Sequence, residues 1–250
     1  MTTTQTLLLL VAGAVAGTIG AAGGIASLVS YPALLAVGIP ALPANVTNAV
    51  ALVTFWPGSA LGSQPELRGQ GAWVRRWAPV AIGGSALGTA LLLLTPSTIF
   101  TQIVPLLVAF ASVVLLVQPW ISVRPEHRSS QGAALLLPCG LFAVSVYNSY
   151  WGAGSGVMTF TLLLLTVNQH LATSNALKNM LLGIAQAVCV IGFVLFGPVH
   201  WGAAVPLAVG TLAGSMIGPS VTRRLPAPLL RVLVALSGFW LAAHLWATRG

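Results

Sequence analysis

The hydrophobic positions of this chain fall in long unbroken runs rather than in alternation with polar positions. Three examples are TLLLLVAGAVAG near the N-terminus, LLVAFASVVLLV in the middle and LLGIAQAVCVIGFVLF in the second half. Strands that cross a membrane alternate apolar and polar residues, whereas membrane-spanning helices are apolar over about 20 consecutive residues. The pattern therefore predicts an all-α polytopic membrane protein.

Polar residues, prolines and glycines divide the chain into ten apolar segments. These lie near residues 6–22, 25–39, 43–63, 77–94, 98–120, 132–150, 154–167, 171–197, 202–220 and 229–247. The pieces at 25–39 and 154–167 are shorter than the roughly 20 helical residues that a crossing needs. Each adjoins a glycine-rich break, so we expect broken or re-entrant helices at these two places.

Composition places the chain in lipid. Hydrophobic residues make up 57% of it and charged residues only 5%, with a mean hydropathy of +0.95. That is too little polar surface to coat a water-soluble globule, so the expected environment is a bilayer. The net charge of +8 comes from arginines in short tracts between apolar segments, not from a basic arm. Such tracts favour topology signals over nucleic-acid binding.

The arginine-bearing loops predict an orientation. They follow the third, fifth and ninth segments and contain Arg68, Arg75, Arg76, Arg124, Arg128, Arg223, Arg224 and Arg231. All of them share one side if each short piece and its predecessor together make no net crossing. By the positive-inside rule that side is cytoplasmic, which puts both termini outside a cell (plasma or inner) membrane.

Two similar strings indicate an internal repeat. Residues 45–50 read NVTNAV and residues 172–177 read ATSNAL, so that Thr47 pairs with Ser174 and Asn48 with Asn175, 127 positions later. We expect a first transmembrane repeat over 1–120, a cytoplasmic linker at 121–131 and a second repeat over 132–250. About five segments starting outside, followed by five starting inside, form two inverted repeats. In transporters of that architecture, broken helices meet near mid-membrane at the site.

The glycine breaks are the first site candidates. A helix that begins inside the membrane presents unpaired N–H groups and a positive dipole end, and glycine allows a ligand close to that backbone. We expect two facing anion-binding sites, formed by Gly23, Gly24, Ser27, Gly154, Ser155 and Gly156. The alternative is that these glycines only allow helices to pack closely.

Polar side chains inside the predicted spans are the second set of candidates. Thr47, Asn48, Ser174 and Asn175 supply hydroxyl and amide groups, and Asn148 and Trp151 directly precede the second break. Lys178 is the only charged residue well inside a predicted span, and no intramembrane carboxylate is present to pair with it. The expected partner is a bound anion. The alternative is that Lys178 extends to the cytoplasmic interface.

Missing residue types exclude several functions. The chain has no Asp, and its only carboxylate side chains, Glu66 and Glu126, fall in predicted loops. This removes the usual proton relay, sodium ligand and metal-binding carboxylate from the membrane interior. Cys139 and Cys189 have no motif spacing. We therefore expect no enzyme activity, no metal and no cofactor.

The residues around the two breaks resemble those of the TauE/SafE sulfite-exporter family, also called TSUP, a group of small membrane anion transporters. The first half has GTIGAAGGIASLVSYPALLAVGIPALPANVTNAV and the second has GAGSGVMTFTLLLLTVNQHLATSNALKN. The resemblance carries Gly17, Gly20, Gly23, Gly24, Pro32 and Thr47, and then Gly152, Gly154, Gly156, Ala172, Thr173 and Ser174. It implies transport of sulfite, sulfonates or related organic anions.

These observations together predict a secondary transporter, and specifically an exporter, of a small sulfur-containing or organic anion. The expected partners are this anion and the lipid bilayer, and association of two chains as a homodimer stays open. An anion channel, a non-transporting scaffold or accessory subunit, and a membrane thiol-disulfide carrier are the alternatives.

Overall fold

The computed structural model describes residues 1–23, 26–57, 64–121, 130–167 and 170–222, and short pieces between 235 and 247. Every regular element in this part of the chain is a helix, which confirms the predicted all-α class. The helices are α1 (Thr3–Gly23), α2 (Ser27–Ala36), α3 (Ala41–Leu52), α5 (Gln64–Leu67), α6 (Gly71–Leu94), α7 (Ser97–Ile121), α8 (Ser130–Tyr150), α9 (Ser155–Thr166), α10 (Leu171–Phe196) and α11 (Trp201–Thr222).

Four helices in the described part of the chain are long and apolar enough to cross a membrane. They contain the stretches Thr3–Gly20, Gly71–Leu94, Ser97–Val117 and Leu171–Phe196. Large apolar side chains are exposed along their outer faces, among them Val11 on α1, Leu106 on α7 and Leu195 on α10. A water-soluble protein rarely exposes so much apolar surface, whereas lipid accepts it.

The two predicted short pieces are short helices. α2 has 10 residues and α9 has 12. The prediction of a single span over 43–63 was wrong, because α3 ends at Leu52. After it, Thr54 N bonds to Ala51 O and Trp56 N to Val53 O, so α3 stops in tight turns at Val53 and Thr54. A separate helical turn follows at residues 55–57.

Glycines fix the closest helix contacts. A Cβ added at Gly13 of α1 would meet the carbonyl of Leu207 on α11, and one at Gly214 would meet the carbonyl of Ala14. The same holds for Gly88 of α6 against Val146 of α8. Small residues let membrane helices approach each other in this way. They hold α1 to α11 and α6 to α8.

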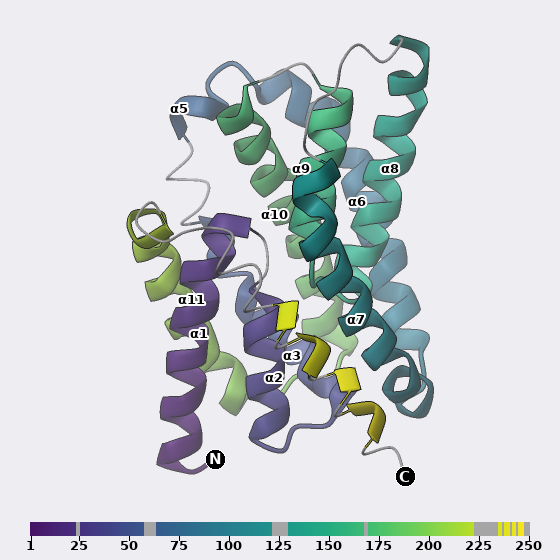
Figure 1. Cartoon of the computed structure of the whole chain (residues 1–250). Coiled ribbons are helices and arrows are strands. Elements are labelled where there is room, and N and C mark those ends of the chain that lie inside the picture. Colours follow the sequence, from purple (N-terminus) through teal and green to yellow (C-terminus); the bar gives the residue numbers. More distant parts are fainter. Residues whose placement is uncertain are drawn as a thin grey trace.

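The short helices lie between these pairs. In Figure 1, α1 and α11 stand on one side, α6, α7 and α8 on the other, and α2 and α3 lie between them with α10. The N-terminus lies at one end of the molecule and α5, which precedes Arg68, at the opposite end. The arginines at 124, 128, 223, 224 and 231 lie outside the described residues, as does most of the tenth segment, and membrane sidedness stays a prediction.

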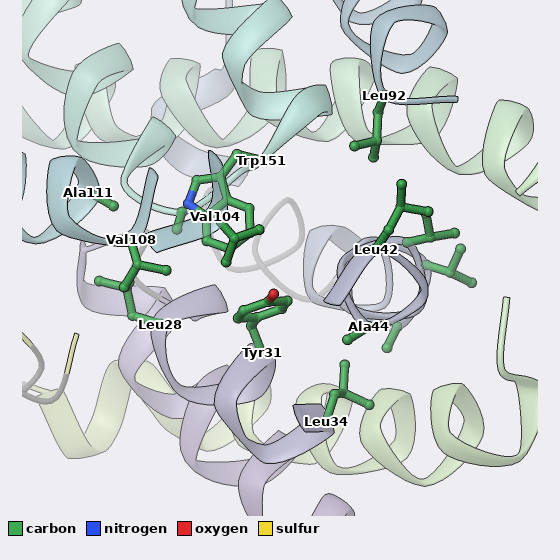
Figure 2. Packing of buried hydrophobic residues seen from close by; sticks show 14 of the residues in the cluster. Leu28, Tyr31, Leu34, Leu42, Ala44, Leu92, Val104, Val108, Ala111 and Trp151 are labelled. Carbon is green, nitrogen blue, oxygen red and sulfur yellow. The ribbon is translucent and has the colours of Figure 1, made fainter. Parts of the chain in front are cut away.

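A buried apolar cluster joins the two halves. Figure 2 shows Tyr31 of α2 facing Trp151, which precedes α9, and Val104 of α7. Leu34 of α2 and Leu42 of α3 belong to the same cluster. Residues more than a hundred positions apart in sequence thus share one core. The core places the starts of α2 and α9 close together.

Candidate functional site

A cavity of about 120 Å³ lies where the short helices of the two halves meet. A water needs only about 10–15 Å³ of such volume, so a small polyatomic ion with several waters fits. Seven of the predicted site residues line it: Ser27, Asn48, Asn148, Trp151, Ser155, Gly156 and Lys178. We refer to it below as the central cavity.

Lys178 is the cation of the central cavity. It lies two turns into α10 and is only 3% exposed, so its side chain does not extend to the surface. Its Nζ donates to Asn175 Oδ1 at 2.7 Å and lies 5.8 Å from the centre of the Phe160 ring. Within the described residues, no carboxylate contacts it. A buried ammonium without a counter-charge is costly, and a bound anion would relieve that cost.

The polar face of α3 supplies fixed amides. Asn48 is 2% exposed, and its Oδ1 accepts a 2.6 Å hydrogen bond from Ser30 Oγ on α2. Asn45 Nδ2 donates to the carbonyl of Tyr150 at 2.9 Å, which ties α3 to the break before α9. Both asparagines line the central cavity.

The start of α9 contributes backbone. Gly152 and Gly154 have φ of 85° and 80°, a conformation that glycine adopts without strain and other residues rarely adopt. The helical hydrogen bonds begin with Met158 N to Gly154 O, and Ser155 N bonds to Gly152 O at 3.2 Å. Among the described residues, the amides of Gly156 and Val157 have no backbone acceptor, so these two are available to a ligand. Ser155 and Gly156 of that turn line the central cavity, as does Ser27 at the start of α2.

Four other predicted residues lie beside the cavity rather than on it. Thr47 accepts a hydrogen bond from the backbone N–H of His200 at 3.0 Å. Gly154 packs against Ala111, and Ser174 is fully buried. Asn175 acts on the cavity through its bond to Lys178.

The first break is only partly described. Gly23 is the last residue of α1. Gly24 lies outside the described residues, so the expected pair of facing glycine sites stays a prediction there. Ala26 and Ser27, directly after the break, line the cavity.

Several lining residues were not predicted. They include Asn45, Ser149, Gly152, Asn179 and Gln186. Asn175, Lys178, Asn179 and Gln186 recur at helical spacing along one face of α10, which is a signal the sequence contains. Trp56 also lines the cavity, with its indole against Gly183, where a Cβ would overlap the ring.

The remaining candidates do not form a reactive centre. Cys139 is exposed and Cys189 is buried, and both are free thiols. The residues that the structure describes contain no cluster of His, Cys, Asp and Glu suited to a metal ion.

Fold and site together define a polytopic helical membrane protein with a cationic cavity between broken helices. The family model "Sulfite exporter TauE/SafE" matches residues 7–245, and the chain belongs to this family. It is 27% identical over 247 residues to a "Probable membrane transporter protein" of Haemophilus influenzae, covering 95% of this chain and 93% of the relative. It is 25% identical over 243 residues to "Probable membrane transporter protein ORF9" of a Sinorhizobium species, covering 96% and 91%. No solved structure matches the chain. The protein is a membrane transporter of this family.

Proposed function

We propose that this transporter is a secondary carrier that exports a small sulfur-containing or organic anion, such as sulfite or a sulfonate. The observation that carries the proposal is Lys178, a cation that lines the central cavity and has no anionic partner among the described residues. The proposal includes no chemical step, metal or cofactor.

The groups around the cavity suit an oxyanion. Lys178 Nζ has three N–H donors and uses one on Asn175. The start of α9 adds amide N–H groups and the positive end of a helix dipole. Hydroxyl and amide side chains from both halves complete the lining. Charge-assisted hydrogen bonds of this kind are about twice as strong as neutral ones.

The membrane potential gives export a driving force. Moving one negative charge outward across about 100 mV, inside negative, releases roughly 2.3 kcal/mol, equivalent to about a fifty-fold gradient. Export therefore requires no coupling ion. That suits a cavity whose described lining contains no carboxylate.

Thermal unfolding of the purified protein tests the proposal. We expect sulfite, sulfoacetate or thiosulfate to raise the unfolding temperature of the wild type, and taurine, a zwitterion, to do so less. In Lys178→Met this stabilisation disappears, while the unfolding temperature without anion rises, because an unpaired buried charge has been removed. Stabilisation that survives in Lys178→Met contradicts the role of Lys178. No stabilisation of the wild type by any anion favours the scaffold alternative.

A further inference from the structure

Gln186 links the two halves of the molecule at the central cavity. Its Nε2 donates to the carbonyl of Ala49 on α3 at 2.7 Å. Its Oε1 lies 3.5 Å from Asn148 Nδ2, and Asn148 Oδ1 accepts from Ser155 Oγ at 2.7 Å. A chain of polar contacts thus runs from the start of α9 to the end of α3.

The direction of this chain is determined by its last member. The Ala49 carbonyl can only accept, so the nitrogen of Gln186 must face it. The oxygen of Gln186 then faces Asn148, whose nitrogen must point back to it. Asn148 Oδ1 then faces the hydroxyl of Ser155, which is 2.7 Å from both Asn148 Oδ1 and the Gly152 carbonyl and donates to these two acceptors. The amides of Gln186 and Asn148 thus each have one orientation that satisfies their neighbours.

The Ala49 carbonyl is a group that α3 itself leaves unsatisfied. In a continuing helix it would accept from Val53 N, but Val53 N bonds to Val50 O at 3.4 Å instead. A helix end inside the membrane needs a partner for such a carbonyl, because no bulk water is present. Gln186 supplies it from the other half of the chain. The end of α3 is therefore held by α10.

Gln186 and Lys178 lie at opposite ends of the cavity. Gln186 follows Lys178 by eight positions on α10, and this spacing corresponds to about 12 Å along the helix axis. Leu177 and Leu181 pack near Trp73 and Trp77, at the arginine-bearing end of the molecule. Gln186 therefore lies toward the other end. An anion at Lys178 has no need to contact Gln186.

We propose that Gln186 is a positioning residue that couples the two halves during transport. It holds the end of α3 and, through Asn148, the start of α9 in the arrangement that closes the cavity at the end away from Lys178. Removing it is expected to change turnover rather than affinity. This inference rests on the proposed transport of an anion.

Gln186→Met tests the coupling because it keeps the side-chain volume and removes both polar contacts. Gln5→Met is the matched control, since Gln5 Nε2 also donates to a backbone carbonyl, that of Val37, at 3.4 Å and away from the cavity. Sulfite counterflow in proteoliposomes is expected to slow about five- to tenfold in Gln186→Met, as for one lost buried hydrogen bond, with half-saturating sulfite changed less than about twofold. Gln5→Met should match the wild type. An unchanged rate, equal slowing in Gln5→Met, or weakened affinity that accounts for the slowing would overturn the inference.

A second measurement needs no substrate and is made in membranes. Ser27→Cys, at a position that lines the cavity, is combined with Cys139→Ser and Cys189→Ser. An impermeant thiol reagent is then added from one side at a time. Labelling from the side opposite the arginines is expected to rise about fivefold in Gln186→Met and to stay unchanged in Gln5→Met. Unchanged labelling in Gln186→Met overturns the coupling. If no anion is transported by the wild type but labelling rises, the proposed function fails and the coupling stands.

Discussion

The helix pairs α2–α3 and α9–α10 meet at the same cavity but differ in length and charge. α3 ends after 12 residues inside the molecule, whereas α10 continues for 26. The fifth residue of each helix is an asparagine, Asn45 and Asn175, while the eighth is Asn48 in α3 and Lys178 in α10. One half thus presents a neutral amide that accepts from Ser30, and the other presents a charge that donates to Asn175 of its own helix.

The two halves of the chain contribute different features to the cavity. Asn45 reaches across to the Tyr150 carbonyl, so the first half fixes the geometry of the break. Lys178 donates to Asn175 of its own helix, and an ammonium has two further N–H donors for a ligand. We infer that the first half shapes the cavity and the second half supplies the charge.

Giving α3 and α10 the same residue at their eighth position should have the largest effect on anion binding. Lys178→Asn gives both helices the same residue at the eighth position and is expected to weaken anion binding at least about tenfold, the value of a charged hydrogen bond. The additional change Asn48→Lys should restore part of the affinity, because Asn48 lines the same cavity. Anion titrations followed by unfolding temperature measure both. A double variant as weak as Lys178→Asn would show that the two positions are not interchangeable.

A change at the start of α9 should have the next largest effect, and this effect is on the free energy of unfolding. Gly154→Ala forces a side chain into a left-handed conformation and is expected to lower the free energy of unfolding by about 1–2 kcal/mol. Its neighbour Ala153→Gly is the control with the opposite change. Thermal unfolding without anion compares them. Equal stability of Gly154→Ala and wild type would contradict the geometry of this break.

Removing the hydroxyl that fixes Asn48 should have a smaller effect. Ser30→Ala leaves Asn48 Oδ1 without its donor and is expected to cost about 1 kcal/mol of stability, with a modest loss of anion affinity. Ser112→Ala is the control, because within the described part of the chain that buried hydroxyl bonds to Val108 O of its own helix. The two variants are compared by thermal unfolding with and without sulfite. A larger effect of Ser112→Ala would contradict the role of Ser30.

The smallest effect on anion affinity is expected from a change at Asn175, which accepts the hydrogen bond of Lys178. Asn175→Ala removes one neutral acceptor but leaves the charge, so anion affinity should change less than about fivefold. Isothermal titration with the same anion as for Lys178→Asn gives the comparison. A loss as large as that of Lys178→Asn would mean that Asn175 contacts the anion itself.

Most helices could be predicted because their apolar runs are continuous. The short α2 and α9 follow from the glycine breaks, but the end of α3 at Leu52 does not, since residues 49–53 around it are all apolar and contain no glycine or proline. The carbonyl of Ala49 near that end accepts from Gln186, a residue far away in sequence. Lys178 could be found because a charge inside a span is rare and costly. Gln186 follows it at helical spacing, but its contact with Ala49 on α3, like that of Asn45 with Tyr150, lies across the two halves and needs the structure.

The most direct test of the central claim is sulfite movement in proteoliposomes with an imposed membrane potential and no proton or sodium gradient. The account predicts that sulfite leaves the compartment that is electrically negative, against a concentration gradient of up to about fifty-fold at 100 mV, and that Lys178→Met abolishes this movement. Concentrative uptake that requires a proton or sodium gradient, or potential-driven export that persists in Lys178→Met, would contradict it.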